Sequence, residues 1–424
     1  MNKPLNRIVR TGSGVAIHAG DEVARGGQAI LYAAVNSQTG QKGFLKQFMH
    51  SSPAERAAIT TRTKFLVNAR LCDVSPLFRS APTEWYVDGD DVGHFAPQAP
   101  GSSLDDLMQG GWAPDFLGLL QLALALVHAV SLLHARGWAH GDLHAANLYV
   151  DAAENSVLKP TFIDYDNFWH ASMPAPQNSI GQVFYLAPEQ RVALAKGESL
   201  PPDQAIERYM LAVLLHTVLL LRHPAHQAAE EPERFNAQMT AGVWPDDPAR
   251  GERPVAGGYP PSVLNVALQG LFRRGFSLRL EERPTPQEWE RVLDDATNLV
   301  FVCPRCGGPV VLDRSKIKCP FAACAKPYPA LGVVLPGGKT LPISGGGLRL
   351  GRDDLGGSRT VSRVHAVFER FGGEFRVVNY GANGLYRSLA GSWERLPDRA
   401  PFVLQPGDVL RFADSAEVLL QDLG

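Results

Sequence analysis

The sequence predicts a multidomain α+β fold in which a β-rich lobe, a helical lobe, a small cysteine-bearing unit and an all-β sandwich follow one another along 424 residues. The first hundred residues alternate short β-prone runs such as "AILYAAV" with Gly, Asn, Ser and Asp, which favour turns. Two long apolar runs, residues 116–135 and 209–221, indicate one sizeable helical core. Four of the five cysteines then fall between Cys303 and Cys324, and a Gly-punctuated, alternating segment follows them.

These patterns also place the domain boundaries. A hydrophobic content of 45% is ample for several packed cores. Within the β-rich lobe we expect one helix that begins after Ser52, because Ser is a favoured N-cap and Pro53 suits the first helical position. The four predicted domains are, in order, residues 1–99, 100–298, 299–330 and 331–424.

Composition and charge narrow the class of protein. The formal net charge is −2, so the chain lacks the basic excess that marks a nucleic-acid binder, and no nucleic-acid partner is expected. The first residues, "MNKPLNRIVRTGSG", have no apolar stretch behind their basic side chains, which argues against a secretory signal and favours a cytoplasmic location. Residues 116–135 are long enough to span a bilayer, but they include Gln121 and two histidines, so we expect a buried helix and no membrane span.

The stretch "HGDLHAANLYV" carries the first chemical signal. "NLYV" predicts a strand, "DAAENS" a turn and "VLKPTFIDYD" the returning strand, which brings Asn147 and Asp164 to the same open end. An amide oxygen and a carboxylate there suit Mg²⁺ or Mn²⁺ bound together with nucleotide phosphates. Asp142, five residues before Asn147, is placed to accept a proton from an attacking hydroxyl.

These motifs resemble those of the eukaryotic-type Ser/Thr protein kinases. The quoted residues are "HGD", the asparagine that follows it, "DYD", and "APE" at residues 187–189. The resemblance implies a bilobal protein-kinase-like fold with its N-lobe at residues 1–99 and its C-lobe at 100–298. It also implies an enzyme that transfers the γ-phosphoryl group of MgATP to a protein hydroxyl, with Asp142 as the base and Asn147 and Asp164 holding Mg²⁺.

Further positions match the kinase pattern. Gly26 and Gly27 in "VARGGQAILY" resemble the phosphate-binding loop, although the same residues also suit an ordinary hairpin turn. Lys46 in "GFLK" resembles the lysine that binds the ATP phosphates. By the same resemblance Arg283 in "ERPTPQEW" pairs with Glu189 of "APE", which belongs to a peptide-docking segment and favours a protein substrate.

Several residues around the ATP site depart from the kinase pattern. Ala24 and Ala29 replace glycines of the phosphate loop, which stiffens it. Phe44 replaces a small alanine above the adenine and could obstruct the nucleotide. Asn68 occupies the position of the helix glutamate that pairs with the lysine, and Glu55 is an alternative partner.

Two further departures concern the catalytic loops. Gly141 replaces the arginine that in many kinases receives a phosphate from the activation loop, so we expect no activation by loop phosphorylation. Asp166 replaces the glycine of the metal-binding motif, which could add a carboxylate near the metal or restrict the loop. The departures leave an alternative open: a pseudokinase scaffold whose working part is the phosphopeptide-binding domain at the C-terminus.

The cysteine cluster predicts a zinc ribbon. Cys303 and Cys306, then Cys319 and Cys324, form two tight pairs separated by twelve residues, and four thiolates suit tetrahedral Zn²⁺ in a structural role. Disulfides are the alternative, which a reducing cytoplasm disfavours. Cys72, alone in the first lobe, is interpreted as a buried small apolar residue.

The C-terminal motifs "LRLGRDD", "TVSRVHAVFERF" and "NYGANGLY" resemble the forkhead-associated (FHA) domain, an all-β sandwich whose loops read phosphothreonine. Arginine and hydroxyl groups can grip a phosphate dianion, and an asparagine can hold the peptide backbone. His365 is expected to support the loop, and Ala382 replaces a threonine of the family. By resemblance, the residues that contact the phosphopeptide are Arg352, Ser362, Arg363 and Asn383.

The order of kinase, zinc ribbon and FHA domain resembles the bacterial kinases of the tellurium-resistance-associated triad. That resemblance implies two protein partners, a von Willebrand A domain protein and a PP2C-type phosphatase. A phosphothreonine on the chain itself or on a partner is then the expected ligand of the FHA domain.

Overall fold

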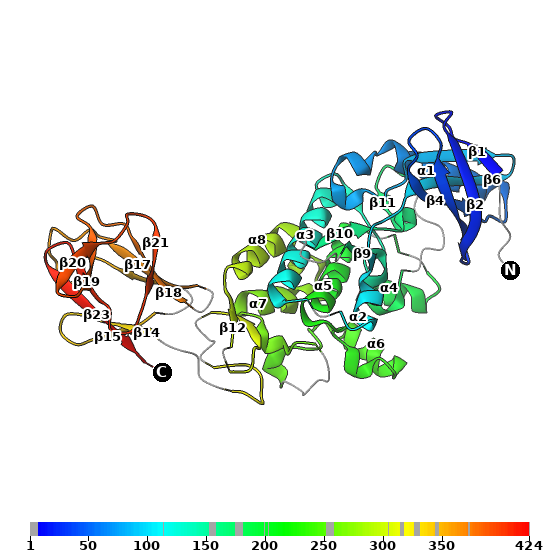
Figure 1. Ribbon diagram of the computed structural model, residues 1–424. Helices are drawn as coiled ribbons and strands as arrows, with labels where there is room; N and C mark the ends of the chain where they lie inside the picture. Colours follow the sequence, from blue (N-terminus) through cyan, green and yellow to red (C-terminus); the bar gives the residue numbers. More distant parts are fainter. Residues whose placement is uncertain are drawn as a thin grey trace. The chain divides into compact units, whose positions relative to one another are not determined.

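The computed structural model (Figure 1) consists of two compact units, which are described separately below. One comprises residues 1–246 and 271–291, and the other comprises residues 247–270 and 292–424. The division between the units runs through helices α7 (Val266–Gly275) and α8 (Pro286–Thr297). The structure describes residues 7–112, 114–151, 158–173, 181–198, 200–201, 203–251, 258–303, 305–313, 318–325, 331–343, 347–371 and 374–423.

The first unit opens with a six-stranded antiparallel sheet in the order β1-β2-β3-β4-β6-β5. Strand β1 also lies against β5, so the sheet curves round a core that includes Ile17, Leu45 and Phe95. The alternation of β4 places Leu45 in this core and turns Phe44 and Lys46 to the opposite face. The strands are β1 (Arg7–Arg10), β2 (Ala16–Arg25), β3 (Ala29–Asn36), β4 (Lys42–Phe48), β5 (Glu84–Asp88) and β6 (Asp91–Pro97).

A single long helix, α1 (Pro53–Asn68), accompanies this sheet and contacts β5 and β6. It begins where the sequence predicts, because the Ser52 side chain accepts a hydrogen bond from the Glu55 N–H and Pro53 fits the first turn. Cys72 follows the helix and is only half-buried, with its thiol 3.7 Å from a carboxylate oxygen of Asp73. The interpretation of Cys72 as a buried small apolar residue was therefore wrong.

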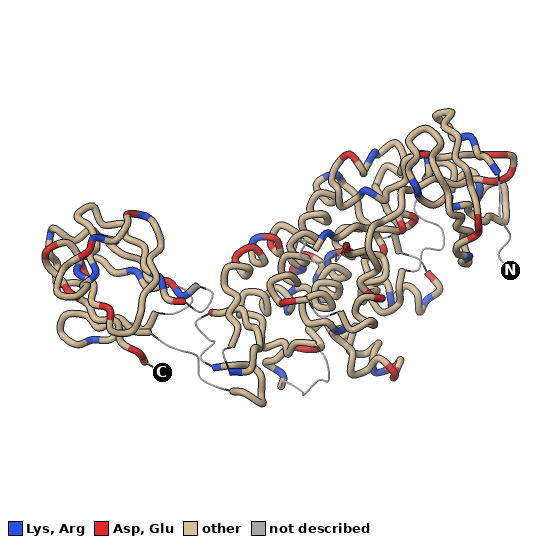
Figure 2. Tube along the Cα trace, viewed as in Figure 1, with Lys and Arg blue, Asp and Glu red and all other residues tan. Residues whose placement is uncertain are grey.

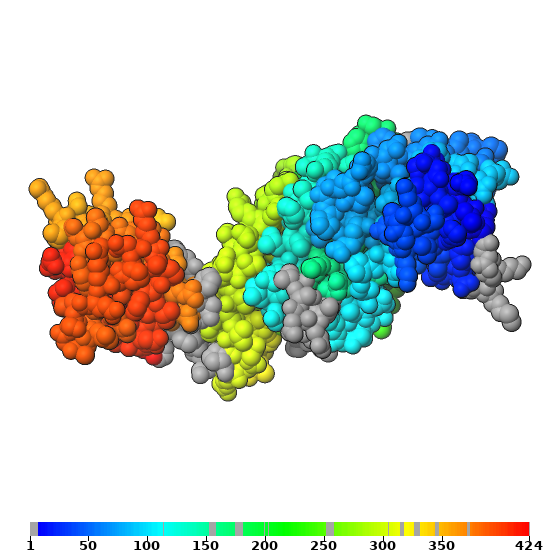
Figure 3. Space-filling view, turned by 45° about the horizontal axis from the view of Figure 1, so that its top comes forward, coloured from blue at the N-terminus to red at the C-terminus, as the bar shows by residue number. Residues whose placement is uncertain are grey.

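The rest of the first unit is mainly helical (Figure 1), and its two most apolar helices, α3 and α5, pack against each other. Figure 3 shows the surface of this unit, from blue at the N-terminal sheet to cyan in the part that follows. Helix α3 is long and apolar enough to cross a membrane by length and composition, but more than half of its most apolar stretch is buried inside the protein. The helices are α2 (Leu104–Gln109), α3 (Phe116–His134), α4 (Pro188–Ala195), α5 (Gln204–Leu220), α6 (Pro232–Thr240), α7 (Val266–Gly275) and α8 (Pro286–Thr297).

Short strands in the helical part carry the loops of the candidate site. Strands β9 (Leu148–Asp151) and β10 (Lys159–Phe162) pair antiparallel, as the sequence predicts, with Leu148 opposite Phe162. The predicted turn between them lies, beyond Asp151, outside the described residues. The remaining short strands are β7 (Ser102–Ser103), which pairs with β9, and the pair β8 (Trp138–Ala139) and β11 (Trp169–His170).

The second unit contains the cysteine cluster and a β-sandwich. Strands β12 (Val300–Val302) and β13 (Pro309–Val311) form a small hairpin beside the cysteines. The sandwich has one sheet in the order β15-β14-β23-β22-β19-β20 and another in the order β16-β17-β18-β21. Its strands are β14 (Leu331–Val334), β15 (Thr340–Pro342), β16 (Leu348–Leu350), β17 (Ala366–Phe371), β18 (Glu374–Asn379), β19 (Leu385–Leu389), β20 (Ser392–Arg395), β21 (Pro401–Leu404), β22 (Val409–Phe412) and β23 (Ala416–Asp422).

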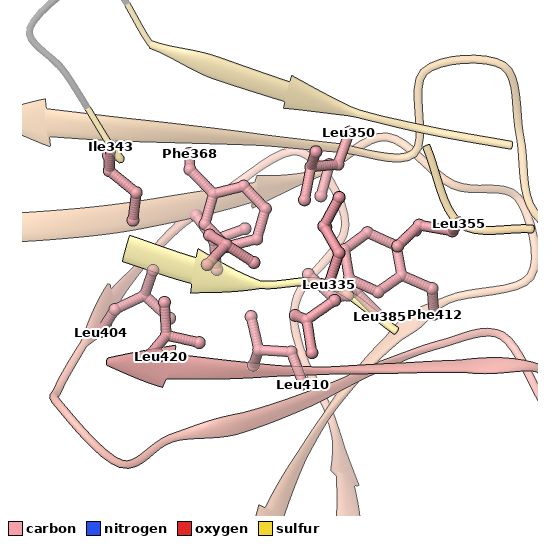
Figure 4. Close-up of a cluster of buried hydrophobic side chains, with 14 of the residues drawn as sticks. Leu335, Ile343, Leu350, Leu355, Phe368, Leu385, Leu404, Leu410, Phe412 and Leu420 are labelled. Atoms are coloured by element: carbon pink, nitrogen blue, oxygen red, sulfur yellow. The ribbon is translucent and has the colours of Figure 1, made fainter. Parts of the chain in front are cut away.

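The core of the sandwich is apolar and comes from both sheets (Figure 4). Phe368 and Leu404 project from one sheet, and Leu410, Phe412 and Leu420 project from the other. All five side chains are buried, as alternating strands with one face on a core require. Figure 2 shows Lys and Arg interspersed with Asp and Glu along both units, in keeping with the near-neutral net charge.

Candidate functional site

Lys46 on β4 is held by two carboxylates from a loop far along the chain. Its Nζ lies 2.8 Å from Asp164 Oδ1 and 2.5 Å from Asp166 Oδ2. Burial disfavours the charged lysine, but attraction to Asp166 and Asp164 outweighs burial and raises its pKa. The same burial raises the pKa of Asp166 to about 6, whereas the Lys46 charge keeps the pKa of Asp164 lowered in spite of its burial.

Asp142 lies buried in a ring of hydrogen-bond donors. Gln182 donates its backbone N–H to Oδ1 at 3.0 Å, and the side-chain amides of Asn147 and Asn167 donate to Oδ2 at 3.3 Å and 3.2 Å. His144 Nε2 lies 3.5 Å from Oδ1. Burial alone would raise the pKa of Asp142, but the contacts with His144 and Gln182 lower it, so the group is a carboxylate at neutral pH.

The backbone around Asp142 explains the glycine before it. Gly141 has φ of 79°, a left-handed conformation that favours glycine, and its N–H donates to Glu207 Oε2 at 2.8 Å. Glu207 is fully buried on α5 and also accepts from His134 at 3.0 Å. A side chain such as arginine at position 141 would strain this turn, so the backbone geometry itself accounts for the residue.

Asn147 and Asp164 lie at the same end of the β9–β10 hairpin. Ile163, which precedes Asp164, donates its N–H to the Asn147 carbonyl at 3.0 Å and closes that end. The Asn147 amide N–H₂ is used on Asp142, which leaves its side-chain oxygen as the available ligand atom. One carboxylate and one amide oxygen are the donor set that suits Mg²⁺ shared with phosphates.

The partners of Lys46 do not come from helix α1. Glu55 accepts hydrogen bonds from the N–H and hydroxyl of Ser51 at 2.6 Å and 2.7 Å, so it serves the helix N-terminus and not the lysine. Asn68 is exposed at the last position of α1. The expectation of Glu55 as an alternative partner is therefore corrected: Asp164 and Asp166 pair with Lys46.

Helix α1 contributes a buried cation, Arg62, to the region around Asp166. Arg62 is 8% exposed, and its guanidinium donates to the backbone carbonyls of Asp166 and Phe168 at 2.7 Å and 3.0 Å. Burial lowers the pKa of Arg62 to about 10. The i, i+4 spacing of Arg62 and Leu66 is the sequence feature that predicts Arg62 on the buried side of the helix.

The two glycines predicted to face phosphate, Gly26 and Gly27, occupy the exposed turn between β2 and β3. The Gly26 N–H donates to the Ala29 carbonyl at 2.9 Å. Phe44 is half-buried on the same sheet face as Lys46 and lines a groove of about 710 Å³ together with Ala33 and Gln98. Its ring therefore occupies part of the sheet face that also carries Lys46, although Lys46 itself does not line the groove.

Arg283 and Glu189 form a bidentate ion pair. The guanidinium donates to both carboxylate oxygens at 2.6 Å and 2.9 Å, and it also donates to the carbonyls of Ala205 and Ser277. The Arg283 side chain is fully buried, and that of Glu189 is 25% exposed. The ion pair attaches the segment that ends in "APE" to the rest of the first unit. The same segment includes Gln182, whose N–H donates to Asp142.

The four clustered cysteines have the geometry of a metal site. All four sulfurs lie within 4.8 Å of one another, with Cys303 and Cys324 3.8 Å apart and Cys306 and Cys319 3.6 Å apart. Zinc with ~2.3 Å bonds in a tetrahedron separates its sulfurs by about 3.8 Å, whereas a disulfide would need ~2.0 Å. The described thiols are free cysteines, so the cluster fits Zn²⁺.

The cysteine knuckle also carries the expected backbone donors. Gly308 donates its N–H to Cys306 Sγ at 3.4 Å. Burial opposes ionisation of Cys303, but the N–H groups of Cys306 and Arg305 outweigh it and lower the pKa of that thiol to about 7. Such N–H···S contacts stabilise thiolates, which are the form that binds metal.

At one end of the β-sandwich, three loops bring the predicted phosphopeptide residues together. The Arg352 guanidinium donates to the Val361 carbonyl at 3.0 Å, which fixes it along the next loop. Ser362 Oγ accepts the Ala382 N–H at 3.3 Å, and the Asn383 amide donates to the Thr360 carbonyl at 2.7 Å. Arg363 and Asn383 are exposed and Arg352 and Ser362 are half-buried, so the group faces solvent.

The buried side chain of His365 links two of these loops by hydrogen bonds. It is fully buried, accepts the Ser362 N–H on Nδ1 at 3.2 Å and donates from Nε2 to the Gly384 carbonyl at 2.8 Å. Burial lowers its pKa, which keeps the ring neutral and able to do both. A Cβ on Gly381 would lie 2.1 Å from His365 Nε2, so only glycine fits there. The supporting role expected for His365 agrees with these contacts.

The two-sheet sandwich presents basic and polar side chains on the loops at one end, and such groups can bind a phosphopeptide. Residues 348–413 match the FHA domain family, which spans β16 to β22 and confirms the sequence prediction for this part of the chain. Domains of this family recognise phosphothreonine peptides. Comparison with curated proteins gives no match to the chain.

Proposed function

We propose that the first unit is an ATP-dependent protein kinase and that the FHA domain reads phosphothreonine on the chain itself or on a partner. The observation that carries the proposal is the convergence of Lys46, Asp164 and Asp166 in one ion cluster, although 118 residues separate Lys46 from Asp164. The same Asp164 follows the hairpin whose other strand begins after Asn147. This arrangement supports phosphoryl transfer because that reaction needs positioned charge more than covalent chemistry.

Each residue of the site would have a separate role in phosphoryl transfer. Lys46 would hold the ATP phosphates, and Asn147 and Asp164 would hold Mg²⁺ or Mn²⁺, which neutralises phosphate charge. Asp142, ionised at neutral pH, would orient the substrate hydroxyl and accept its proton. The donors now on its carboxylate, from Gln182 and two asparagine amides, hold that carboxylate in one orientation.

A protein substrate is favoured by the segment that ends in Glu189. This segment is fixed by the Arg283 ion pair and passes Asp142 at Gln182, so a peptide bound along it would present its hydroxyl to the base. Zn²⁺ on the four cysteines would stabilise the second unit. The resemblance to the tellurium-resistance-associated triad makes a von Willebrand A protein and a PP2C-type phosphatase the proposed partners, in the cytoplasm.

The second candidate function is a pseudokinase scaffold, and the position of Phe44 favours it. A half-buried phenyl ring beside Ala33 in the sheet-face groove competes with a nucleotide base for the same apolar surface. In that case the FHA domain would supply the activity and the first unit would serve as a binding platform.

One experiment separates the two candidates. Purified chain is incubated with radiolabelled ATP, Mg²⁺ or Mn²⁺ and a generic protein substrate, and the Asp164→Ala variant is run in parallel. A kinase labels the substrate or itself and loses labelling in the variant. Absence of labelling, together with no thermal shift by ATP, overturns the proposal of a kinase.

A further inference from the structure

We propose that Asp166 is the residue that positions Lys46, taking the place of a carboxylate on helix α1. This inference rests on the proposed function, because it concerns how the phosphate-binding lysine is kept in place. Asp166 acts through Lys46 and is a positioning residue. It lies in the loop that carries Asp164, and not on the helix.

The contacts around Lys46 single out Asp166. Lys46 Nζ is 2.5 Å from Asp166 Oδ2, and the side chains of Lys46 and Asp166 are only 20% and 15% exposed. Asp166 Oδ1 is buried and has no hydrogen-bond partner among the described residues. The Lys46 ammonium is therefore the main compensation for burying this carboxylate, since an unpaired buried charge is costly.

Helix α1 offers no competing partner. Its single acidic residue is Glu55, which is bound to Ser51. A cavity of about 100 Å³ beside Asp166 is lined from α1 by apolar residues, Thr63, Glu55 and the cation Arg62. The Asp166 carboxylate thus interacts with two cations, directly with Lys46 and through electrostatic attraction with Arg62.

The presence of two carboxylates on Lys46 matters because Asp164 has a second proposed role. Asp164 contacts Lys46 and is also the carboxylate expected to bind the metal, so metal binding would draw it away from the lysine. Asp166 leaves Lys46 with a buried counter-charge when Asp164 turns to the metal. Lys46 then stays in position to meet the phosphates, and phosphate binding gains from a group that is already oriented.

Arg62 attaches helix α1 to the loop that carries Asp166. Its two hydrogen bonds to the Asp166 and Phe168 carbonyls join the helix to the backbone on both sides of Asn167. The lysine is therefore positioned by the loop, and the helix is attached to that loop through Arg62. An inward movement of α1 is not needed to complete the ion pair.

The test is a double-mutant cycle on Lys46→Met and Asp166→Asn, in the full chain. We measure kcat/KM for radiolabelled phosphoryl transfer, MgATP affinity by calorimetry, and thermal unfolding without ligand. Asp166→Asn should lower kcat/KM and MgATP affinity by roughly 10- to 100-fold, since small misplacements of a positioning group cost about that much. It should add little when Lys46→Met is already present, because both changes remove one interaction. Asp90→Asn, at a side chain that is 98% exposed, is the matched control and should change none of these quantities.

The outcomes are separable. Independent effects of the two substitutions, which multiply in the affinity and add in the unfolding free energy, would overturn the role of Asp166. So would an Asp166→Glu variant no better than Asp166→Asn. Should the wild type neither bind nor use MgATP, the proposed function fails. The unfolding cycle then still decides whether Lys46 and Asp166 are coupled, because that measurement needs no nucleotide. Asp166→Glu also covers the case in which Asp166→Asn does not fold.

Discussion

The ion pair between Arg283 and Glu189 makes a quantitative prediction about stability. Replacing Arg283 with Met keeps most of its volume but removes two bonds to Glu189 and two to the carbonyls of Ala205 and Ser277. Breaking a buried ion pair by removing one partner costs roughly 3–5 kcal/mol. Glu189 remains 25% exposed and regains some hydration, so Arg283→Met should lie at the lower end, about 3 kcal/mol.

Replacing the other partner of the ion pair, Glu189, should destabilise the protein more. Glu189→Leu leaves the guanidinium of Arg283 fully buried without its counter-charge, so we expect a loss of about 4–5 kcal/mol. The double variant should lose less than the sum, because neither charge is then left without its partner. The exposed pair Arg234–Glu231 has a similar separation of 2.7 Å and serves as the control, and Arg234→Met should change stability by no more than about 0.5 kcal/mol.

Denaturant unfolding of the full chain, monitored by tryptophan fluorescence, measures these differences, and a thermal scan gives the same ranking at about 2–4 °C per kcal/mol. Equal effects of Arg283→Met and Arg234→Met would refute the reasoning, since burial and not separation is what distinguishes the two pairs. A double variant as damaged as the sum of the single variants would refute the coupling.

Three further predictions concern the other sites. Metal analysis of the purified chain should give about one zinc per molecule, and Cys319→Ser should lower that content and expose the second unit to proteolysis, whereas Cys72→Ser should leave zinc unchanged. Arg352→Ala should weaken binding of a phosphothreonine peptide by roughly 10- to 100-fold in fluorescence anisotropy, as loss of a charge-assisted bond implies, with exposed Arg349→Ala on β16 as the control; unchanged affinity would count against the site. Phe44→Ala should enlarge the groove on the sheet face and lower the KM for MgATP, and a raised KM would show that the ring supports the nucleotide.

Much of the fold could be predicted because its signals are local. Ser52 followed by Pro53 fixes the start of α1, and the alternation after Asn147 predicts the β9–β10 hairpin. The cysteine spacing brings four sulfurs within 4.8 Å of one another. The three C-terminal motifs predict the domain that the family match confirms at residues 348–413.

What the sequence did not predict depends on tertiary contacts. The pairing of Lys46 with Asp166 joins a strand to a loop 120 residues away, and no spacing rule distinguishes it from pairing with Glu55. The motif shows only that Gly141 stands where many kinases have an arginine. Its φ of 79° and the hydrogen bond from its N–H to Glu207 show that the backbone requires a glycine there. The hydrogen bond from the Gln182 backbone N–H to Asp142 could not be predicted from residue type, because any non-proline residue can donate it.

The central claim is that Asp142 serves as the base of a phosphotransferase site. The most direct test is the rate of phosphate transfer from MgATP to protein by the wild type and by Asp142→Asn, which keeps the size and shape of the buried side chain but replaces one of its accepting oxygens with an N–H₂ group. Because a positioned general base contributes about 10²- to 10⁴-fold, the rate should fall at least about 100-fold with little change in MgATP affinity. A variant that transfers phosphate at the wild-type rate would contradict the account.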